Sequence, residues 1–149
     1  MTLTFDDVIV SRQQARPQNV KLIHDYFERQ VDLRPHHRAL ECEDGTLTYA
    51  QLERAANKIA HFLRSRHIRP EDLVGIYLPK STNLFAAILG VLKAGAGYVP
   101  IDPQTPIERI GQIAGDANLA IVLTNETLSE LVQPSITCCA FFPLARQWP

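Results

Sequence analysis

Cysteine is scarce in this sequence, with three residues among 149. Cys138 and Cys139 are adjacent and Cys42 is distant in sequence. The three therefore form neither an even-numbered disulfide framework nor a Cys-x-x-Cys metal or redox motif. This usage is typical of a reducing compartment, so we expect a cytoplasmic protein. The vicinal pair is most simply interpreted as inert core residues.

Long apolar runs and an excess of one charge are also absent. The longest strongly apolar run, Leu84 to Leu92, is nine residues, well short of the ~20 that cross a bilayer. No charged-then-apolar leader opens the chain. Fifteen Lys and Arg are scattered among sixteen Asp and Glu, for a net charge of −1. We therefore expect neither a membrane nor a nucleic acid as a partner.

Sequence motifs of known chemistry are missing as well. There is no Gly-x-x-x-x-Gly-Lys-Ser/Thr phosphate loop and no Gly-x-Ser-x-Gly nucleophile elbow. Gly95-x-Gly97 follows a predicted helix and precedes a predicted strand, which is the reverse of the order in a dinucleotide-binding loop. Asp102 and Glu108 could form a carboxylate pair, but an Asp before Pro and a Glu at the third helical position are more often turn and cap residues.

The histidines do not show the spacing of a metal or acid–base site. His24 and His61 lie on predicted helices without a partner four residues on, and His67 follows a predicted helix end. His36 and His37 are neighbours in a loop. We expect structural or solvated roles for all of them. From its own residues the sequence predicts no catalytic, cofactor-binding or metal-ligating residue.

The length suits one domain, which would bury roughly 68–70% of its unfolded surface if the fold closes on itself. Residues 1–20 are mostly polar with a weak apolar patch at Val8 to Val10 and are interpreted as a leader or linker. Residues 21–149 carry the periodic patterns of a folded domain.

The first part of that domain predicts a helix, a hairpin and a second helix. A helical pattern begins at Lys21 and ends at or before Arg34, because Pro35 follows. Period-two alternation from Arg38 to Glu43 predicts a strand, with a tight turn at Asp44-Gly45 and a return strand at Thr46-Leu47. Thr48 and Gln51 then form a capping box. The helix that it starts has one apolar stripe: Leu52, Ala55, Ala56, Ile59, Ala60 and Leu63.

The rest of the domain alternates strands and helices. Leu73 to Leu78 reads as a strand covered on both faces, and a helix capped by Ser81 or Thr82 is so apolar that it must be buried. Lys93 suits the dipole at that helix's end, Gly95 closes it in the left-handed conformation, and a strand runs from Tyr98 to Ile101.

A weaker helix follows. Thr105 and Glu108 predict a second capping box with Pro106 at the first helical position. Packing by Ile107, Ile110 and Ala114 must hold this helix, since it contains two glycines. Three later patterns predict a strand at Leu119 to Leu123, a helix at Leu128 to Leu131 and a strand at Ile136 to Phe142, after which 143–149 stops without structure. The fold class is therefore α/β, with alternating helices and mostly parallel strands.

Two long motifs resemble signature segments of one family, the amino-acid adenylation domains of nonribosomal peptide synthetases. Leu47-Thr48-Tyr49-Ala50-Gln51-Leu52 is similar to the family's first signature, and the segment from Leu92 to Asp102 is similar to the second. Within the wider adenylate-forming superfamily, the sequence from Tyr98 to Pro103 is closer to that of peptide synthetases than to that of acyl-CoA synthetases or luciferases. Gly97 departs from the family, which usually has alanine there.

The resemblance implies that residues 21–149 are the N-terminal portion of an AMP-binding domain, an incomplete subdomain of the adenylate-forming synthetase fold. Such domains use ATP and magnesium to join a carboxylate to AMP, and then load a carrier protein's phosphopantetheine thiol. Their phosphate loop, substrate-binding and ribose-binding aspartates, hinge and C-terminal lysine would all lie beyond Pro149. We therefore transfer no catalytic or ligand-binding residue and expect the chain alone to be inactive and to bind no cofactor.

The resemblance also implies partners. These are the remainder of the adenylation domain or a synthetase, with a phosphopantetheine carrier protein as a further candidate. Without later strands and helices, we expect Leu73 to Leu78 or Leu119 to Leu123 to face solvent. Two alternatives stay open: a non-catalytic docking protein that binds a synthetase or carrier protein, and an unrelated small α/β enzyme, which would need a nucleotide site.

Overall fold

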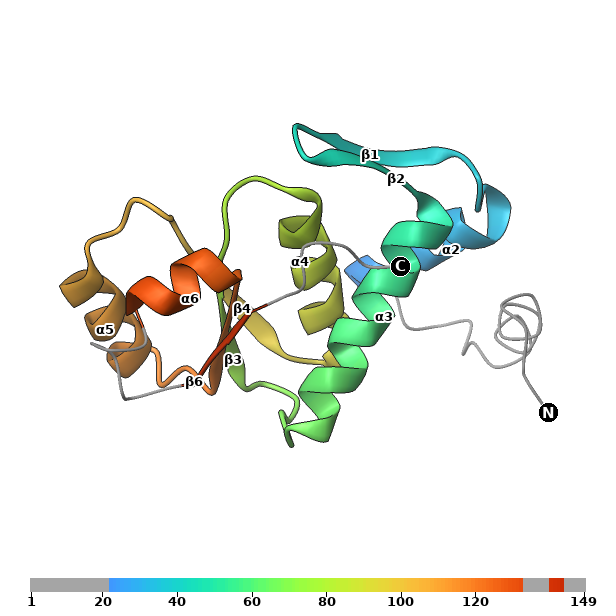
Figure 1. The fold of residues 1–149 in the computed structure, drawn as a ribbon. Coiled ribbons are helices and arrows are strands. Elements are labelled where there is room, and N and C mark those ends of the chain that lie inside the picture. The colour runs from blue at the N-terminus through green and yellow to red at the C-terminus, as the bar shows by residue number, and fades with distance from the viewer. Residues whose placement is uncertain (1–21, 133–139, 144–149) are drawn as a thin grey trace.

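The computed structural model describes residues 22–132 and 140–143, which form a four-stranded parallel sheet flanked by helices and a separate two-stranded hairpin (Figure 1). The order across the sheet is β4-β3-β5-β6. The strands are β1 (Arg38–Cys42), β2 (Gly45–Thr48), β3 (Leu73–Tyr77), β4 (Gly97–Ile101), β5 (Ile121–Thr124) and β6 (Ala140–Pro143). The helices are α2 (Ile23–Leu33), α3 (Tyr49–Ser65), α4 (Thr82–Ala94), α5 (Ile107–Asp116) and α6 (Glu126–Val132).

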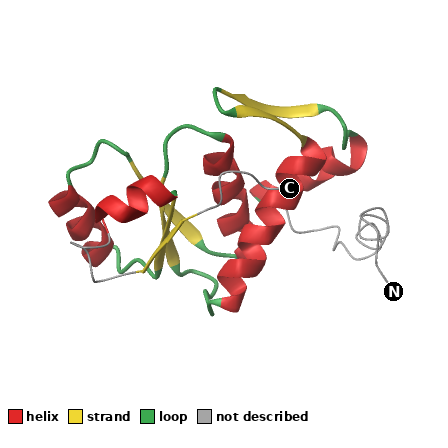
Figure 2. Cartoon of the chain, in the orientation of Figure 1, coloured by secondary structure: helices red, strands yellow, loops and turns green. Residues whose placement is uncertain are grey.

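Helices cover the sheet on both sides (Figure 2). Alternate residues of the central strands point to opposite faces. Val74 and Ile76 of β3 join Leu123 of β5 in a core with α3 and α4. Tyr77 and Val122 point the other way, into a core with α5 and α6. The predicted α/β class with a mostly parallel sheet is confirmed.

The prediction that a central strand would face solvent is wrong. Side chains of β3 and β5 are at most 5% exposed from Val74 to Leu78 and from Ile121 to Leu123, apart from Gly75, which has none. The reason is that α4 and α5 leave β3 and β4 on opposite faces, so the crossovers within this chain cover both. Among the described strands, β4 is an edge, which suits Pro100 because proline lacks the ladder's N–H donor.

Helix α3 follows its sequence pattern closely. The Gln51 N–H donates to Thr48 Oγ1 at 3.2 Å, and the Thr48 N–H donates back to Gln51 Oε1 at 2.9 Å, so the predicted capping box is confirmed. All six stripe residues are buried. Helix α4 crosses α3 very closely: a Cβ built on Gly90 would lie 2.7 Å from Ile59 Cβ. Only glycine fits at this crossing.

Helix α4 begins and ends as predicted but is enclosed on one side only. Ser81 Oγ accepts from the Leu84 N–H at 3.3 Å, and Gly95 has a φ of 86°. The face with Ala87 and Val91 is fully buried, whereas Leu84, Phe85, Ile88 and Leu89 are partly buried. The expectation of burial all round therefore holds for one face.

Three helices end in the same way, with a residue in the left-handed region and a backbone bond that closes the last turn. The residue is His67 (φ 60°) after α3, Gly95 after α4 and Asn118 (φ 47°) after α5. The closing bonds run from Ile68, Ala96 and Leu119 N–H to carbonyls five residues back, at 3.0–3.2 Å.

Two local predictions are wrong. In the hairpin, Cys42 pairs with Gly45, so the turn's central residues are Glu43 and Asp44, and Gly45 (φ 149°) opens β2. Asp44 instead accepts from Thr82 at the start of α4, at 3.0 Å from the N–H and 2.8 Å from Oγ1. Because this long-range bond holds the hairpin tip, local turn chemistry does not decide its register.

The second wrong prediction concerns the start of α5. The helix begins at Ile107 with Pro106 at the capping position and no side-chain cap. Thr105 instead donates its N–H to Asp102 O at 2.9 Å, within the preceding turn. Ile110 and Ala114 are buried as predicted, but Ile107 is 36% exposed.

Other predictions fall partly or wholly outside the described residues. The leader or linker at 1–20, the first four residues of the Ile136 to Phe142 strand, and 144–149 lie there. The described end of that strand pattern is β6, which includes Pro143, so the expectation of no structure from residue 143 is wrong at its first residue. The Leu128 to Leu131 pattern lies within α6. Among the described helices, none has the length and apolarity to cross a membrane.

Candidate functional site: the Lys93 cluster and the carboxyl edge of the sheet

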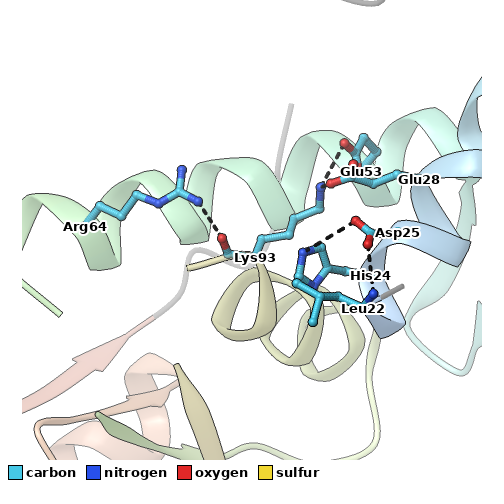
Figure 3. Close-up of polar contacts among 7 residues, drawn as sticks. All are labelled: Leu22, His24, Asp25, Glu28, Glu53, Arg64 and Lys93. Atoms are coloured by element: carbon cyan, nitrogen blue, oxygen red, sulfur yellow. Dashed lines mark hydrogen bonds and ion pairs between the residues drawn. The ribbon is translucent and has the colours of Figure 1, made fainter. Parts of the chain in front are cut away.

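Lys93 is buried between two carboxylates, in what we call the Lys93 cluster (Figure 3). Its Nζ lies 3.0 Å from Glu53 Oε1 and also donates to Glu28 Oε1. The side chains of Lys93 and Glu53 are each 5% exposed and that of Glu28 is 16% exposed. Burial of a charge is costly unless it is paired, and Glu28 and Glu53 supply that pairing for Lys93.

The cluster joins three helices, because Glu28 lies on α2, Glu53 on α3 and Lys93 on α4. The backbone of Lys93 is held as well, since Arg64 near the end of α3 donates to the Lys93 carbonyl. In Figure 3 the Lys93 side chain extends from α4 toward Glu53, on the side away from Arg64. One residue of the second signature-like segment therefore fixes α4 to both neighbouring helices.

Sequence reasoning missed this cluster. It assigned Lys93 only to the helix dipole, because its partners lie 40 and 65 residues away. A signal was available: Glu53 precedes Ala56 by three residues and Ala60 by seven, so it falls on the apolar stripe of α3. A charged residue on a buried stripe predicts a buried partner of opposite charge.

The cluster is not placed to bind a substrate. Open α/β sheets bind ligands outside the carboxyl ends of their strands, where neighbouring connections leave in opposite directions. Here that point lies between β3 and β5, since the chain leaves β3 toward β4 and leaves β5 toward β6. Helix α4 returns antiparallel to β3, so Lys93 at its end lies toward the amino ends of the strands.

Side chains at the carboxyl edge are mostly engaged within the fold. Tyr77 donates to the Pro103 carbonyl at 3.3 Å. Burial, followed by the charge of Asp102, raises the pKa of Tyr77 above its ordinary value. Asp102 Oδ1 accepts from the Gln104 N–H at 2.7 Å, and Asn125 Oδ1 caps α6 by accepting from the Leu128 N–H at 2.9 Å.

Thr124, the last residue of β5, is the exception at this edge. It is fully buried, and its Oγ1 has no hydrogen-bond partner. A single neutral hydroxyl can accept or donate one bond to a ligand, but it supplies neither the charge nor the metal ligands that a nucleotide phosphate needs.

The other candidate residues stay dispersed. Groups of three or more His, Cys, Asp or Glu that could hold a metal are absent from the part of the chain that the structure describes. His24 lies 4.0 Å from Asp25, while His36, His37, His61 and His67 are exposed. Asp102 has its turn bond, as the turn interpretation expected. Glu108 lies in the first turn of α5, but that helix has no side-chain cap, so the cap interpretation is wrong for Glu108. Cys42 is a free thiol whose pKa is raised by burial and then by Asp44, against a smaller lowering by Lys80.

Comparison with known proteins decides the family. The model of the family described as AMP-binding enzyme matches residues 27–141, more than half of the chain. The chain belongs to the AMP-binding enzyme family. It is 44% identical over 110 residues to bacitracin synthase 1 of Bacillus licheniformis, which covers 74% of this chain and 2% of the synthase.

Solved structures of family members agree with the fold. The nonribosomal peptide synthetase FmoA3, in a form bound to α-methyl-L-serine-AMP, matches with a TM-score of 0.78 and 32% identity over 87% of this chain and 14% of its own. The N-terminal subdomain of Klebsiella oxytoca NpsA matches with a TM-score of 0.70 at 21% identity, over 83% of this chain and 32% of its own, which shows the fold alone. The resemblance to adenylation domains of nonribosomal peptide synthetases is confirmed. The chain spans only a small share of each of these relatives.

Proposed function

We propose that this chain is the N-terminal framework of an amino-acid adenylation domain and supplies no reacting group itself. In the proposed reaction of the whole domain, a substrate carboxylate oxygen bonds to the α-phosphorus of ATP and pyrophosphate leaves. The acyl group then passes to the thiol of a carrier protein's phosphopantetheine. Support comes from the family match and from FmoA3, a relative whose structure contains an aminoacyl-AMP. A need for ATP also supports the proposed cytoplasmic location.

The described residues do not fit ATP or magnesium. Magnesium prefers carboxylate and water oxygens, and phosphates need backbone N–H donors or cations in a cradle. The carboxylates of Glu28 and Glu53 are bonded to Lys93, and Asp102 accepts within its own turn. We therefore derive no catalytic step from these residues. In the proposal, nucleotide, magnesium and substrate all bind to the remainder of the domain.

The observation that carries the proposal is the folded form of the Leu92 to Asp102 segment. Its resemblance to the family's second signature is, by itself, a similarity of sequence. In the structure the segment ends α4, turns at Gly95 and becomes edge strand β4, while Lys93 joins the surrounding helices. The segment thus connects α4 to β4 and holds α4 against α2 and α3, which supports a structural role for it.

A chimaera tests the proposal. Residues 22–132 would replace the matching segment in the adenylation domain of bacitracin synthase 1, and ATP–pyrophosphate exchange would be measured with each amino acid. We expect exchange to persist with the parent's amino-acid preference, because the framework carries no selectivity residue. A folded chimaera with no exchange, or with a changed preference, would contradict the proposal.

A second candidate is the non-catalytic docking protein that binds a synthetase or carrier protein. The exposed apolar side chains of α2 favour it, because large exposed apolar patches often mark interfaces. Pull-down of a purified carrier protein or synthetase module by the chain would support this candidate. We consider it the weaker one, because the family match and the aminoacyl-AMP bound to FmoA3 favour the framework role.

A further inference from the structure

Strand β4 is an edge of the four-stranded sheet, since among the described strands it pairs only with β3. The Gly97 N–H at its start donates to the carbonyl of Asp72, the residue before β3, at 2.9 Å. Successive residues of a strand direct their N–H groups to opposite sides, so Val99 and Ile101 also face β3. The backbone groups of residues 98 and 100 therefore point out of the sheet, along what we call the outer edge of β4.

Pro100 stands at one of these two outward positions. Because proline has no N–H, Tyr98 supplies the only backbone donor along the outer edge. Neighbouring backbone groups are already bonded within the fold. The Ala96 N–H donates to the Val91 carbonyl at 3.2 Å, and the Asp102 carbonyl accepts a bond at 2.9 Å within the following turn. A strand that approached the outer edge would therefore find a single free donor.

Apart from this proline, β4 has the properties of a strand that pairs with other chains. Tyr98, Val99 and Ile101 are good strand formers, and the sequence from Ala94 to Ile101 carries no charge. The edge is also accessible, because Tyr98 is 39% exposed and Pro100 is exposed. Uncharged, exposed edges of strand-forming residues readily add a strand from another molecule. Pro100 is thus the feature of β4 that opposes such pairing.

We propose that Pro100 keeps the outer edge of β4 from pairing with the same edge of a second copy of this chain. Two copies related by a two-fold axis would place these edges antiparallel, so that each edge donates to and accepts from the other. With Pro100 each edge offers the Tyr98 N–H alone. Any other residue at position 100 would add a second donor to each edge, and the continuous antiparallel ladder could then form.

Amide hydrogen exchange on the full chain, resolved by residue with NMR, tests the state of the outer edge. We expect the Tyr98 amide to exchange at least about tenfold faster than the amides of Val99 and Ile101, which face β3. Its rate should not change with protein concentration. Association of the chain through any other surface would leave this rate fast, so the measurement reports on the outer edge itself.

Three variants separate the missing donor from other effects of the proline. Pro100→Val restores the N–H with a strand-forming side chain, and we expect its mass in sedimentation to rise about twofold with concentration while Tyr98 exchange slows. Pro100→Lys restores the same N–H with a charge that opposes edge pairing, so we expect it to stay monomeric. Pro106→Val, at an exposed proline outside the strands, is the control and should behave as the unmodified chain.

Several outcomes would overturn the proposal. One is a Tyr98 amide that exchanges as slowly as Val99 and Ile101 in the unmodified chain, because the outer edge would then be paired despite Pro100. Another is a folded Pro100→Val chain that stays monomeric with fast Tyr98 exchange. Equal association of Pro100→Val and Pro100→Lys would show that loss of the rigid proline, rather than the added donor, is the cause. If Pro100→Val does not fold, Pro100→Thr takes its place with the same expected results.

Discussion

Lys93 Nζ lies 3.0 Å from Glu53 Oε1, and both side chains are 5% exposed. This ion pair connects the start of the second signature-like segment, in the last turn of α4, to the N-terminal part of α3. The Lys93 ammonium group also contacts Glu28 of α2. Lys93 can therefore be essential for the stability of the fold without taking part in any reaction.

Loss of Lys93 should be strongly destabilising. We expect Lys93→Met to lower the free energy of unfolding by about 3–5 kcal/mol, because two carboxylates would lose their shared cation in a buried site. Urea unfolding followed by circular dichroism measures this. Lys80→Met, at an exposed lysine, is the control and should change stability by about 0.5 kcal/mol or less.

A second variant shows whether the loss comes from uncompensated charge. Adding Glu53→Gln to Lys93→Met should recover part of the stability, since it removes one of the two stranded carboxylates. If the double variant is less stable than Lys93→Met alone, packing of the lysine stem rather than charge pairing would explain the loss.

The Thr124 hydroxyl should reduce stability in this chain. Because Oγ1 is buried without a partner, Thr124→Val should raise the free energy of unfolding by about 1 kcal/mol while keeping the side chain's shape. Thr46→Val, at an exposed position of the hairpin, is the control and should have little effect. A destabilised Thr124→Val chain would show that the hydroxyl is bonded in solution.

Helix ends give a pair of opposite predictions. His67 adopts a left-handed conformation at a position where glycine carries no Cβ penalty, so His67→Gly should stabilise the chain by up to about 1 kcal/mol. Gly95→Ala should cost about 1 kcal/mol for the same backbone reason. An added Cβ at Gly95 meets Pro70 only at 3.7 Å or more, so no clash contributes. Thermal unfolding of both variants checks the two signs together.

Alkaline stability should depend on Tyr77. Its pKa is raised in the folded chain by burial and then by Asp102, so the folded state retains the proton that the unfolded state releases. Stability is therefore unaffected below the ordinary tyrosine pKa of about 10 and falls as the pH rises above it toward the folded-state value. Tyr77→Phe should remove that part of the alkaline loss, measured as unfolding free energy against pH.

At neutral pH the same substitution has a separate, smaller effect. Tyr77→Phe should cost about 1 kcal/mol there, because the hydrogen bond to the Pro103 carbonyl is lost. Tyr98→Phe, at a tyrosine that is 39% exposed, serves as the control. An alkaline loss of the same size in the Tyr77→Phe and unmodified chains would rule out Tyr77 as its source.

Sequence patterns predicted the parts of this fold that local chemistry decides. The Thr48–Gln51 capping box, the stripe of α3 and the left-handed Gly95 each depend on residues within a single helix or at its end. The Lys93 cluster, and the bond from Asp44 to Thr82, depend on contacts across 38 to 65 residues. A single sequence does not show which distant residues meet in the fold. The prediction from sequence therefore placed the hairpin turn one residue late and missed the Lys93 cluster.

The burial of β3 and β5 could not be predicted for a related reason. The incomplete-subdomain interpretation assumed that later segments cover the sheet. Instead, α4, which follows β3, and α5, which follows β4, cover opposite faces of the sheet within this chain. The expectation of no catalytic residue follows from missing motifs and stays a prediction.

The central claim is that this chain is the framework of an adenylation domain without its nucleotide site. Isothermal titration of the purified chain with ATP and magnesium tests it most directly, with pyrophosphate release assayed in the same sample after amino acids are added. We predict no saturable binding up to millimolar ATP and no release above background. Saturable binding, or release that depends on an amino acid, would contradict the account.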